Sequence, residues 1–362
     1  MRVTIPQMGN LYIPVSTLFR ELNMDMVMPP MNTQRTLSLG TKYSPEGLCI
    51  PFKLTLGNFI EAAELGADTF ITASGYGTCR LGIYAKTQEK ILHDLGYNIE
   101  MIELGVDEKK LAGFMNLMKR ISNNAPWRKI ISAFRFGIAK MDVTDDIERE
   151  MQKIRAREAV KGTALRVYNE ALKTIDEADS MRRLRRIKKD SLEQLKRVTL
   201  NGNKQPLKVC VVGEFYVVLE PFSNLDIENE LGKLGVEATR SLYISEWLKF
   251  GLFFGILKKL RKDQNTILHE AAMPYLKRDI GGEGWETVGH KVIGGEHYDG
   301  LVHLAPFTCM PEIVAQNIMS STKENTPVLT IFCDEQMGKP GMLTRVEAFV
   351  DLLKRRREKF NN

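Results

Sequence analysis

The chain lacks the segments that would direct it into or across a membrane. Its longest apolar stretch, FGLFFGIL at residues 250–257, is far shorter than the roughly 20 apolar residues that span a bilayer. The first thirty residues also lack the basic and then apolar pattern of a secretory signal. These two absences lead us to expect a cytoplasmic protein that has no membrane partner.

Common nucleotide-binding and hydrolase motifs are missing as well. The chain contains no G-x-x-x-x-G-K-[ST] loop and no G-x-S-x-G elbow, and SGYGTCRLG has Arg80 where a dinucleotide loop needs its third glycine. The five histidines form no H-E-x-x-H motif, and we interpret most of them as surface or core residues. His303 is the histidine most worth following, because it lies six residues before Cys309 on the same predicted strand.

Cysteine is scarce, and its spacing excludes two familiar uses. Five cysteines, an odd number in a chain without an export signal, do not suggest a disulfide framework. No C-x2-C pair occurs, so a structural zinc site is a poor fit. Another kind of metal or redox chemistry therefore has to be considered.

The remaining composition is that of a folded globular protein. Of 362 residues, 43% are hydrophobic and 27% are charged, and the formal net charge is +6. Much of the positive excess lies in three runs, at residues 182–189, 258–262 and 354–359. Because no nucleic-acid-binding motif accompanies these runs, we interpret them as solvated helix faces and do not expect a nucleic-acid partner.

Strand and helix patterns alternate in two separate parts of the chain, which predicts parallel sheets covered by helices. We expect an α/β protein with two Rossmann- or flavodoxin-like domains joined by a helical segment. The predicted units are an N-terminal α/β domain at residues 1–107, a helical arm or linker at 108–204, and a C-terminal α/β domain at 205–362. Cys49 and Cys79 belong to the first domain and Cys309 to the last.

Three cysteines share a local setting at predicted helix starts. Cys49 precedes Ile-Pro-Phe-Lys, Cys79 ends ASGYGTC, and Cys309 ends LAPFTC. Unpaired amides and the helix dipole stabilise negative charge there, which lowers the pKa of a thiol and favours the thiolate that binds metal. The loops before Cys79 and Cys309 follow predicted strands, so both should lie at carboxyl ends of a parallel sheet. Small buried hydrophobic residues remain the alternative for each cysteine.

The other two cysteines have weaker patterns. Cys210 lies in the middle of the apolar strand KVCVVG, and we predict that it belongs to the core. Cys333 ends the strand LTIFC, where either a structural role or a fourth metal ligand fits, and we favour the structural role. Cysteines spread over two domains suit a cluster larger than one ion, such as an iron–sulfur cluster held by thiolates.

Four stretches of the chain resemble the 2-hydroxyacyl-CoA dehydratase component D family, in the branch called acyl-CoA dehydratase activase-related or CoA protein activase. They are EGLCIPFKLTLGN, ASGYGTCR, LAPFTCMPE and FCDEQMGKPGMLTRVEAF, and they span nearly the whole chain. The resemblance implies a 4Fe-4S cluster at the domain interface, held by Cys49, Cys79 and Cys309, with one iron left exchangeable. A neighbouring branch carries a double-cubane cluster that needs more cysteines, so a single cubane is expected here.

The resemblance also implies a reaction and its partners. In that family an ATP-dependent activator injects one low-potential electron, and the dehydratase removes water from a 2-hydroxyacyl-CoA through a ketyl radical. We therefore expect an iron–sulfur protein of anaerobic metabolism that acts as a dehydratase-like lyase component or relays the electron. Its expected partners are the activator, an acyl-CoA substrate, and a second dehydratase-like subunit or a second copy of this chain. The alternative is a cluster-free scaffold that binds a small ligand.

Neighbouring residues suit a negatively charged cluster. Lys53 and Arg80 could offset its charge, and the amides of Gly75 and Gly77 could donate hydrogen bonds to its sulfurs. Solvated side chains at helix starts are the alternative for both basic residues. The sequence assigns no catalytic residue.

Overall fold

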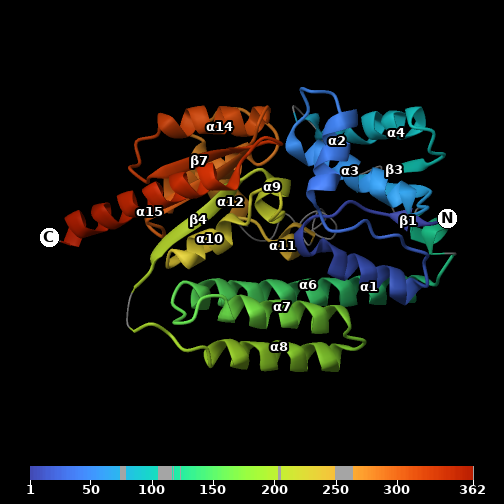
Figure 1. The fold of residues 1–362 in the computed structure, drawn as a ribbon, viewed down its shortest axis with the longest axis horizontal. Coiled ribbons are helices and arrows are strands. Elements are labelled where there is room, and N and C mark those ends of the chain that lie inside the picture. Colours follow the sequence, from blue (N-terminus) through green and yellow to red (C-terminus); the bar gives the residue numbers. More distant parts are fainter. Residues whose placement is uncertain are drawn as a thin grey trace.

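The protein is an α/β structure with two parallel sheets, one of three strands and one of four, in the described part of the chain. Figure 1 shows the computed structural model with these sheets and their helices. The structure describes residues 1–73, 79–104, 116, 118–122, 124–202, 205–248 and 264–361. The predicted α/β class is confirmed.

The N-terminal sheet is parallel throughout, in the order β1-β2-β3. Its strands are β1 (Val3–Thr4), β2 (Thr69–Ala73) and β3 (Glu100–Leu104). Its helices are α2 (Gln34–Tyr43), α3 (Ile50–Glu64) and α4 (Tyr84–Asp94), and the short 3-10 helix η2 (Arg80–Ile83) precedes α4. The alternation of strands and helices predicted for the N-terminal domain is therefore confirmed, and α2 is a further helix that the sequence did not predict.

Helix α3 is buried on every side from Ile50 to Ala63. It crosses α2 so closely that a Cβ at Gly40 would lie 1.7 Å from the Lys53 carbonyl oxygen. A Cβ at Gly57 would likewise lie 2.0 Å from the Thr36 carbonyl oxygen. Glycine is required at both positions because any side chain would separate the two helices.

The C-terminal sheet has the order β5-β4-β6-β7, again with parallel neighbours. Its strands are β4 (Leu207–Gly213), β5 (Val236–Arg240), β6 (Gly300–Pro306) and β7 (Val328–Cys333). The chain continues from β4 to β5 on one side and from β6 to β7 on the other. The carboxyl ends of β4 and β6 therefore flank the point where the strand order reverses, which is where open α/β sheets place their ligands.

Helices cover both faces of the C-terminal sheet (Figure 1). They are α9 (Phe215–Leu219), α10 (Ile227–Lys233), α11 (Ile244–Leu248), α12 (Gln264–Ala272), α13 (Gly284–Gly294), α14 (Met310–Ser320) and α15 (Lys339–Asn361). The strand residues Val209, Val211 and Leu304 join α15 residues Val346 and Val350 in one hydrophobic core. The C-terminal sheet predicted from alternating strand and helix patterns is therefore present, and helices bury its strands on both faces.

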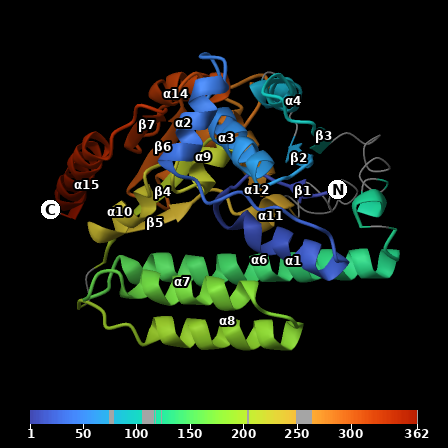
Figure 2. The same cartoon turned by 45° about the vertical axis from the view of Figure 1, so that its right-hand side comes forward.

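Three long helices form a separate layer beneath both sheets, as Figures 1 and 2 show. They are α6 (Trp127–Arg155), α7 (Thr163–Asp176) and α8 (Met181–Lys196), here called the helical arm. Helix α1 (Tyr12–Leu22), from the start of the chain, packs against α6. The N-terminal segment is thereby attached to the arm as well as to its own sheet.

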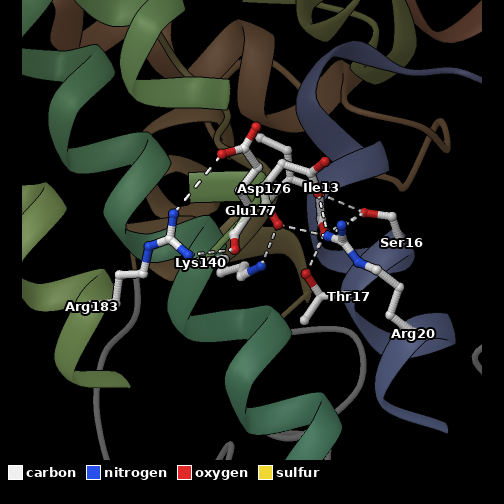
Figure 3. A network of polar contacts seen from close by, with 8 residues as sticks. All are labelled: Ile13, Ser16, Thr17, Arg20, Lys140, Asp176, Glu177 and Arg183. Atoms are coloured by element: carbon white, nitrogen blue, oxygen red, sulfur yellow. Dashed lines mark hydrogen bonds and ion pairs between the residues drawn. The ribbon is translucent and has the colours of Figure 1, made fainter. Parts of the chain in front are cut away.

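A polar network joins α1 to the arm at the end of α7 (Figure 3). The Asp176 carboxylate accepts hydrogen bonds from Ser16 at 2.9 Å and Arg20 at 2.5 Å. The Asp176 carbonyl oxygen accepts from the Lys140 ammonium at 2.8 Å, which caps the last turn of α7. Burial lowers the pKa of Lys140 to about 8.

The other end of the arm meets the C-terminal sheet through buried charges. Arg240, at the end of β5, forms ion pairs with Glu148 of α6 and, at 2.8 Å, with Glu228 of α10. Burial lowers the pKa of Arg240, but the two carboxylates outweigh it and hold that pKa above its usual value. We call these three residues the arm joint.

Within the described residues, no helix is long and apolar enough to cross a membrane. The apolar stretch 250–257 and the basic run 258–262 lie outside the described residues. The basic run 182–189 lies on α8, where Arg182, Arg185 and Arg186 are exposed, as expected for a solvated helix face.

Candidate metal centre

Each of the three candidate cysteines is the residue that immediately precedes a helix. Cys49 is the N-cap of α3, Cys79 of η2 and Cys309 of α14, and all three have extended backbone angles. Pro51 and Pro311 occupy the first turns of α3 and α14, where a missing N–H costs little. The predicted helix starts are confirmed, with the difference that Cys79 begins a 3-10 turn that leads into α4.

The three cysteine-bearing segments meet in space and are tied together by Arg80. Its guanidinium donates one hydrogen bond to the carbonyl oxygen of Gly47 and another to that of Thr308. The Thr308 hydroxyl also donates to the Gly47 carbonyl oxygen, at 3.2 Å. One side chain next to Cys79 thus links the residues that lead into Cys49 and Cys309.

The backbone before Cys309 is held in an uncommon conformation. Thr308 has a φ of +71°, in the left-handed region that a β-branched residue rarely adopts. The Phe307 amide donates to the Cys333 carbonyl oxygen at 2.9 Å and fixes the start of the same turn. Strain of this kind is kept where the surrounding contacts require one loop shape, and here that shape brings Cys309 toward the other two cysteines.

The thiols are enclosed by protein, and this changes their acidity. Cys49 and Cys309 are 9% and 7% exposed, and Cys79 is half-buried. Burial raises the pKa of Cys49 to about 11 and raises the pKa of Cys79 and Cys309 as well. Arg80 lowers the pKa of Cys49 and Cys79 by a smaller amount. The expectation that helix ends would lower these pKa values is therefore wrong for the metal-free protein, because desolvation outweighs the hydrogen bonds and the Arg80 charge that favour the thiolates.

Glu214 is a site residue that the sequence analysis missed. It follows β4 directly and raises the pKa of Cys49, Cys79 and Cys309, so its carboxyl lies near all three thiols. Burial raises the pKa of Glu214 itself to about 7. The signal in the sequence was a Gly-Glu pair at the end of a buried strand.

Gly213 gives Glu214 its position. Its φ is +132°, and a Cβ at this residue would lie 2.0 Å from the Leu304 carbonyl oxygen. The Glu214 amide then donates to the same carbonyl oxygen at 3.1 Å, and the carboxylate accepts from the Val217 amide at 3.0 Å. Glycine permits this close turn, which places the carboxyl at the point where the strand order reverses.

His303 is a satisfied core residue and is not oriented as a ligand. It is fully buried, with Nε2 2.8 Å from Glu312 Oε2 and Nδ1 3.2 Å from Thr330 Oγ1. Glu312 lies in the first turn of α14 and also accepts from the Thr287 hydroxyl at 3.1 Å. This buried group supports the helix that begins after Cys309.

The expected supporting residues have different positions. The Lys53 ammonium is buried and lies 2.5 Å from Glu335 Oε1, so its charge is matched by a carboxylate from beyond β7. Arg80 is half-buried and its guanidinium donates to two carbonyl oxygens. Gly75 and Gly77 lie outside the described residues. For these two glycines the predicted sulfur contacts stay predictions.

The two remaining cysteines are both buried. Cys210 is in the strand core and packs with Val212 and Leu301, which confirms its assignment to the core. Cys333 is fully buried at the end of β7, beside the turn that leads to Cys309. Its Sγ lies 3.9 Å from the Ile331 carbonyl oxygen, and its backbone supports that turn.

In the part of the chain that the structure describes, no three His, Cys, Asp or Glu side chains lie close enough together to hold a single metal ion. A cluster sets a different requirement, because several iron and sulfide atoms lie between its thiolates. The donors that converge here are thiols, which suit iron–sulfur clusters better than hard cations. No protein-family model and no curated protein matches the chain.

Proposed function

We propose that this protein is an iron–sulfur protein that holds one 4Fe-4S cluster through Cys49, Cys79 and Cys309. The observation that carries the proposal is the convergence of three cysteine-bearing helix starts from distant parts of the sequence, tied by Arg80. Structural cysteines have no need of such an arrangement, since each could be buried separately. Cys333 remains a candidate supporting residue or fourth ligand beside this site.

The residues of the site would perform distinct tasks around the cluster. Thiolates replace thiols when iron binds, so the proton that burial now retains on each cysteine would leave with metal uptake. Helix starts and the Arg80 guanidinium would offset the negative charge of the bound thiolates. A cluster held by three thiolates has one iron open to water, to a side chain or to a substrate oxygen.

We further propose that the two sheets correspond to two Rossmann-like domains and that the cluster accepts one low-potential electron from an ATP-dependent activator. The placement of Cys309 and Glu214 at the strand reversal supports a ligand site there. The motif resemblance supports a 2-hydroxyacyl-CoA as substrate and a second subunit or second copy as partner. Radical dehydration and electron relay are the two uses of the electron that follow.

The deciding experiment measures iron and acid-labile sulfide in anaerobically purified protein and records its EPR spectrum after dithionite reduction. We expect about four irons and four sulfides per chain, the content of one cubane. Alanine at Cys49, Cys79 or Cys309 should each lose iron, while Cys210→Ala is the matched control that should keep it. A wild-type protein that stays colourless after reconstitution would instead support the cluster-free scaffold.

A second assay separates the two uses of the electron. The iron-loaded protein would be mixed with its dithionite-reduced activator, ATP and a panel of 2-hydroxyacyl-CoA thioesters, and water loss would be followed. Turnover would establish a lyase. Reduction of the cluster without turnover would favour an electron relay over a lyase.

A further inference from the structure

A buried tyrosine contacts one of the three cysteines directly. The Tyr84 hydroxyl oxygen lies 2.7 Å from Cys49 Sγ, and both residues are less than one-tenth exposed. Tyr84 is the first residue of α4 and follows Cys79 by five residues along the chain. The segment that supplies one proposed ligand thus also supplies the hydrogen-bonding partner of another.

The phenol ring is fixed by its packing. It meets the Phe52 ring edge-on, with centroids 5.0 Å apart and planes at 84°. Phe52 is itself fully buried and lies one turn after Cys49 on α3. Because both ends of the contact are held by helices, the hydroxyl has little freedom to leave the sulfur.

The direction of this hydrogen bond follows from the chemistry of the sulfur. A metal-bound cysteine is a thiolate and can only accept, so the Tyr84 hydroxyl must be the donor when the site is loaded. An ordinary phenol has a pKa of about 10 and keeps its proton at neutral pH, so Tyr84 has a proton to donate. A hydrogen bond to a charged acceptor in a water-poor site is stronger than one in solvent.

We propose that Tyr84 is a positioning residue for the centre: its hydroxyl donates to the Cys49 thiolate and raises the reduction potential of the bound cluster. The inference rests on the proposed function. The donor withdraws charge from the sulfur, and the reduced cluster, which carries one more negative charge, gains more from this than the oxidised cluster does.

The test compares reduction potentials of anaerobically loaded protein by EPR-monitored redox titration. Tyr84→Phe keeps the ring against Phe52 and removes only the donor, so we expect unchanged iron content and a more negative potential. Tyr243→Phe is the matched control, because its hydroxyl donates to Gln152 at 2.9 Å in the arm, away from the cysteines. We expect no shift in that variant.

A strengthened donor gives the opposite change. Replacing Tyr84 with 3-fluorotyrosine makes the phenol more acidic and should shift the potential to a less negative value. This variant preserves the ring and keeps the proposal testable even where Tyr84→Phe fails to fold.

The outcomes separate this inference from the proposed function. A wild-type protein that binds no iron would overturn both. Iron-loaded Tyr84→Phe or fluorotyrosine protein with the wild-type potential, or an equal shift in Tyr243→Phe, would overturn only the role of Tyr84.

Discussion

The arm joint and the site formed by Cys49, Cys79 and Cys309 (the cysteine site) both bury titratable side chains, but they differ in whether those side chains form ion pairs. At the arm joint, Arg240 lies between the carboxylates of Glu148 and Glu228, so each buried charge has an opposite partner. At the cysteine site, Glu214 lies near three thiols, and no ion pair to it occurs among the described residues. Paired charges are typical of a structural joint, whereas a buried carboxyl among thiols, without an ion pair of its own, is typical of a candidate functional site.

The substitution with the largest predicted effect removes the cation from the arm joint. Arg240→Met should lower the free energy of unfolding by about 3–5 kcal/mol, because two carboxylates would remain buried without a cation. Urea denaturation of the metal-free protein measures the change. Replacing Glu148 and Glu228 by glutamine in the same chain should recover part of it. A loss below about 1 kcal/mol from Arg240→Met would show that the joint is not held by its charges.

The next effect tests the tie between the cysteine loops. Arg80→Lys keeps the charge but cannot reach the carbonyl oxygens of Gly47 and Thr308 together, since an ammonium lacks the planar fork of a guanidinium. We expect a loss of about 1–3 kcal/mol in unfolding free energy and faster loss of bound iron to a chelator. Arg120→Lys is the control, because Arg120 pairs with Glu100 on the surface. Equal behaviour of both variants would contradict the role of Arg80.

The smallest predicted effect is an increase in the free energy of unfolding, and it depends on pH. Burial raises the pKa of Glu214 from 4.5 to about 7, so the folded metal-free protein favours the neutral carboxyl. Stability from this group is full below pH 4.5 and is lost as the pH rises to about 7. Glu214→Gln should therefore stabilise the metal-free protein at pH 8 by about 1 kcal/mol, allowing for partial exposure, and should change little at pH 4.

Urea denaturation at the two pH values measures this difference. Glu193→Gln, on the exposed face of α8, is the matched control and should show no pH-dependent change. A Glu214→Gln protein that is less stable than wild type at pH 8 would mean that the carboxylate is paired after all, and the contrast with the arm joint would disappear.

Local patterns predicted most of the elements around the site. The helix starts predicted directly after Cys49 and Cys309 are those of α3 and α14. Helix α2 was missed because its cap is a Thr33–Thr36 box, in which a second threonine replaces the usual Glu or Gln at the third position. Its place against α3 depends on Gly40 and Gly57, which in isolation argue against helices.

The sequence by itself determined that this is an α/β chain with cysteines at helix starts and at the carboxyl ends of strands, because capping chemistry and hydrophobic periodicity act over a few residues. Only the tertiary structure decided which side chains meet there. Arg80 donates a hydrogen bond to the Thr308 carbonyl oxygen, 228 positions further along the chain. Lys53 donates one to the Glu335 carboxylate, 282 positions further along. The tertiary structure also decided the pKa values of the thiols. Desolvation raises them, and it depends on the residues that pack around Cys49 and Cys309 and not on the helices that these cysteines begin.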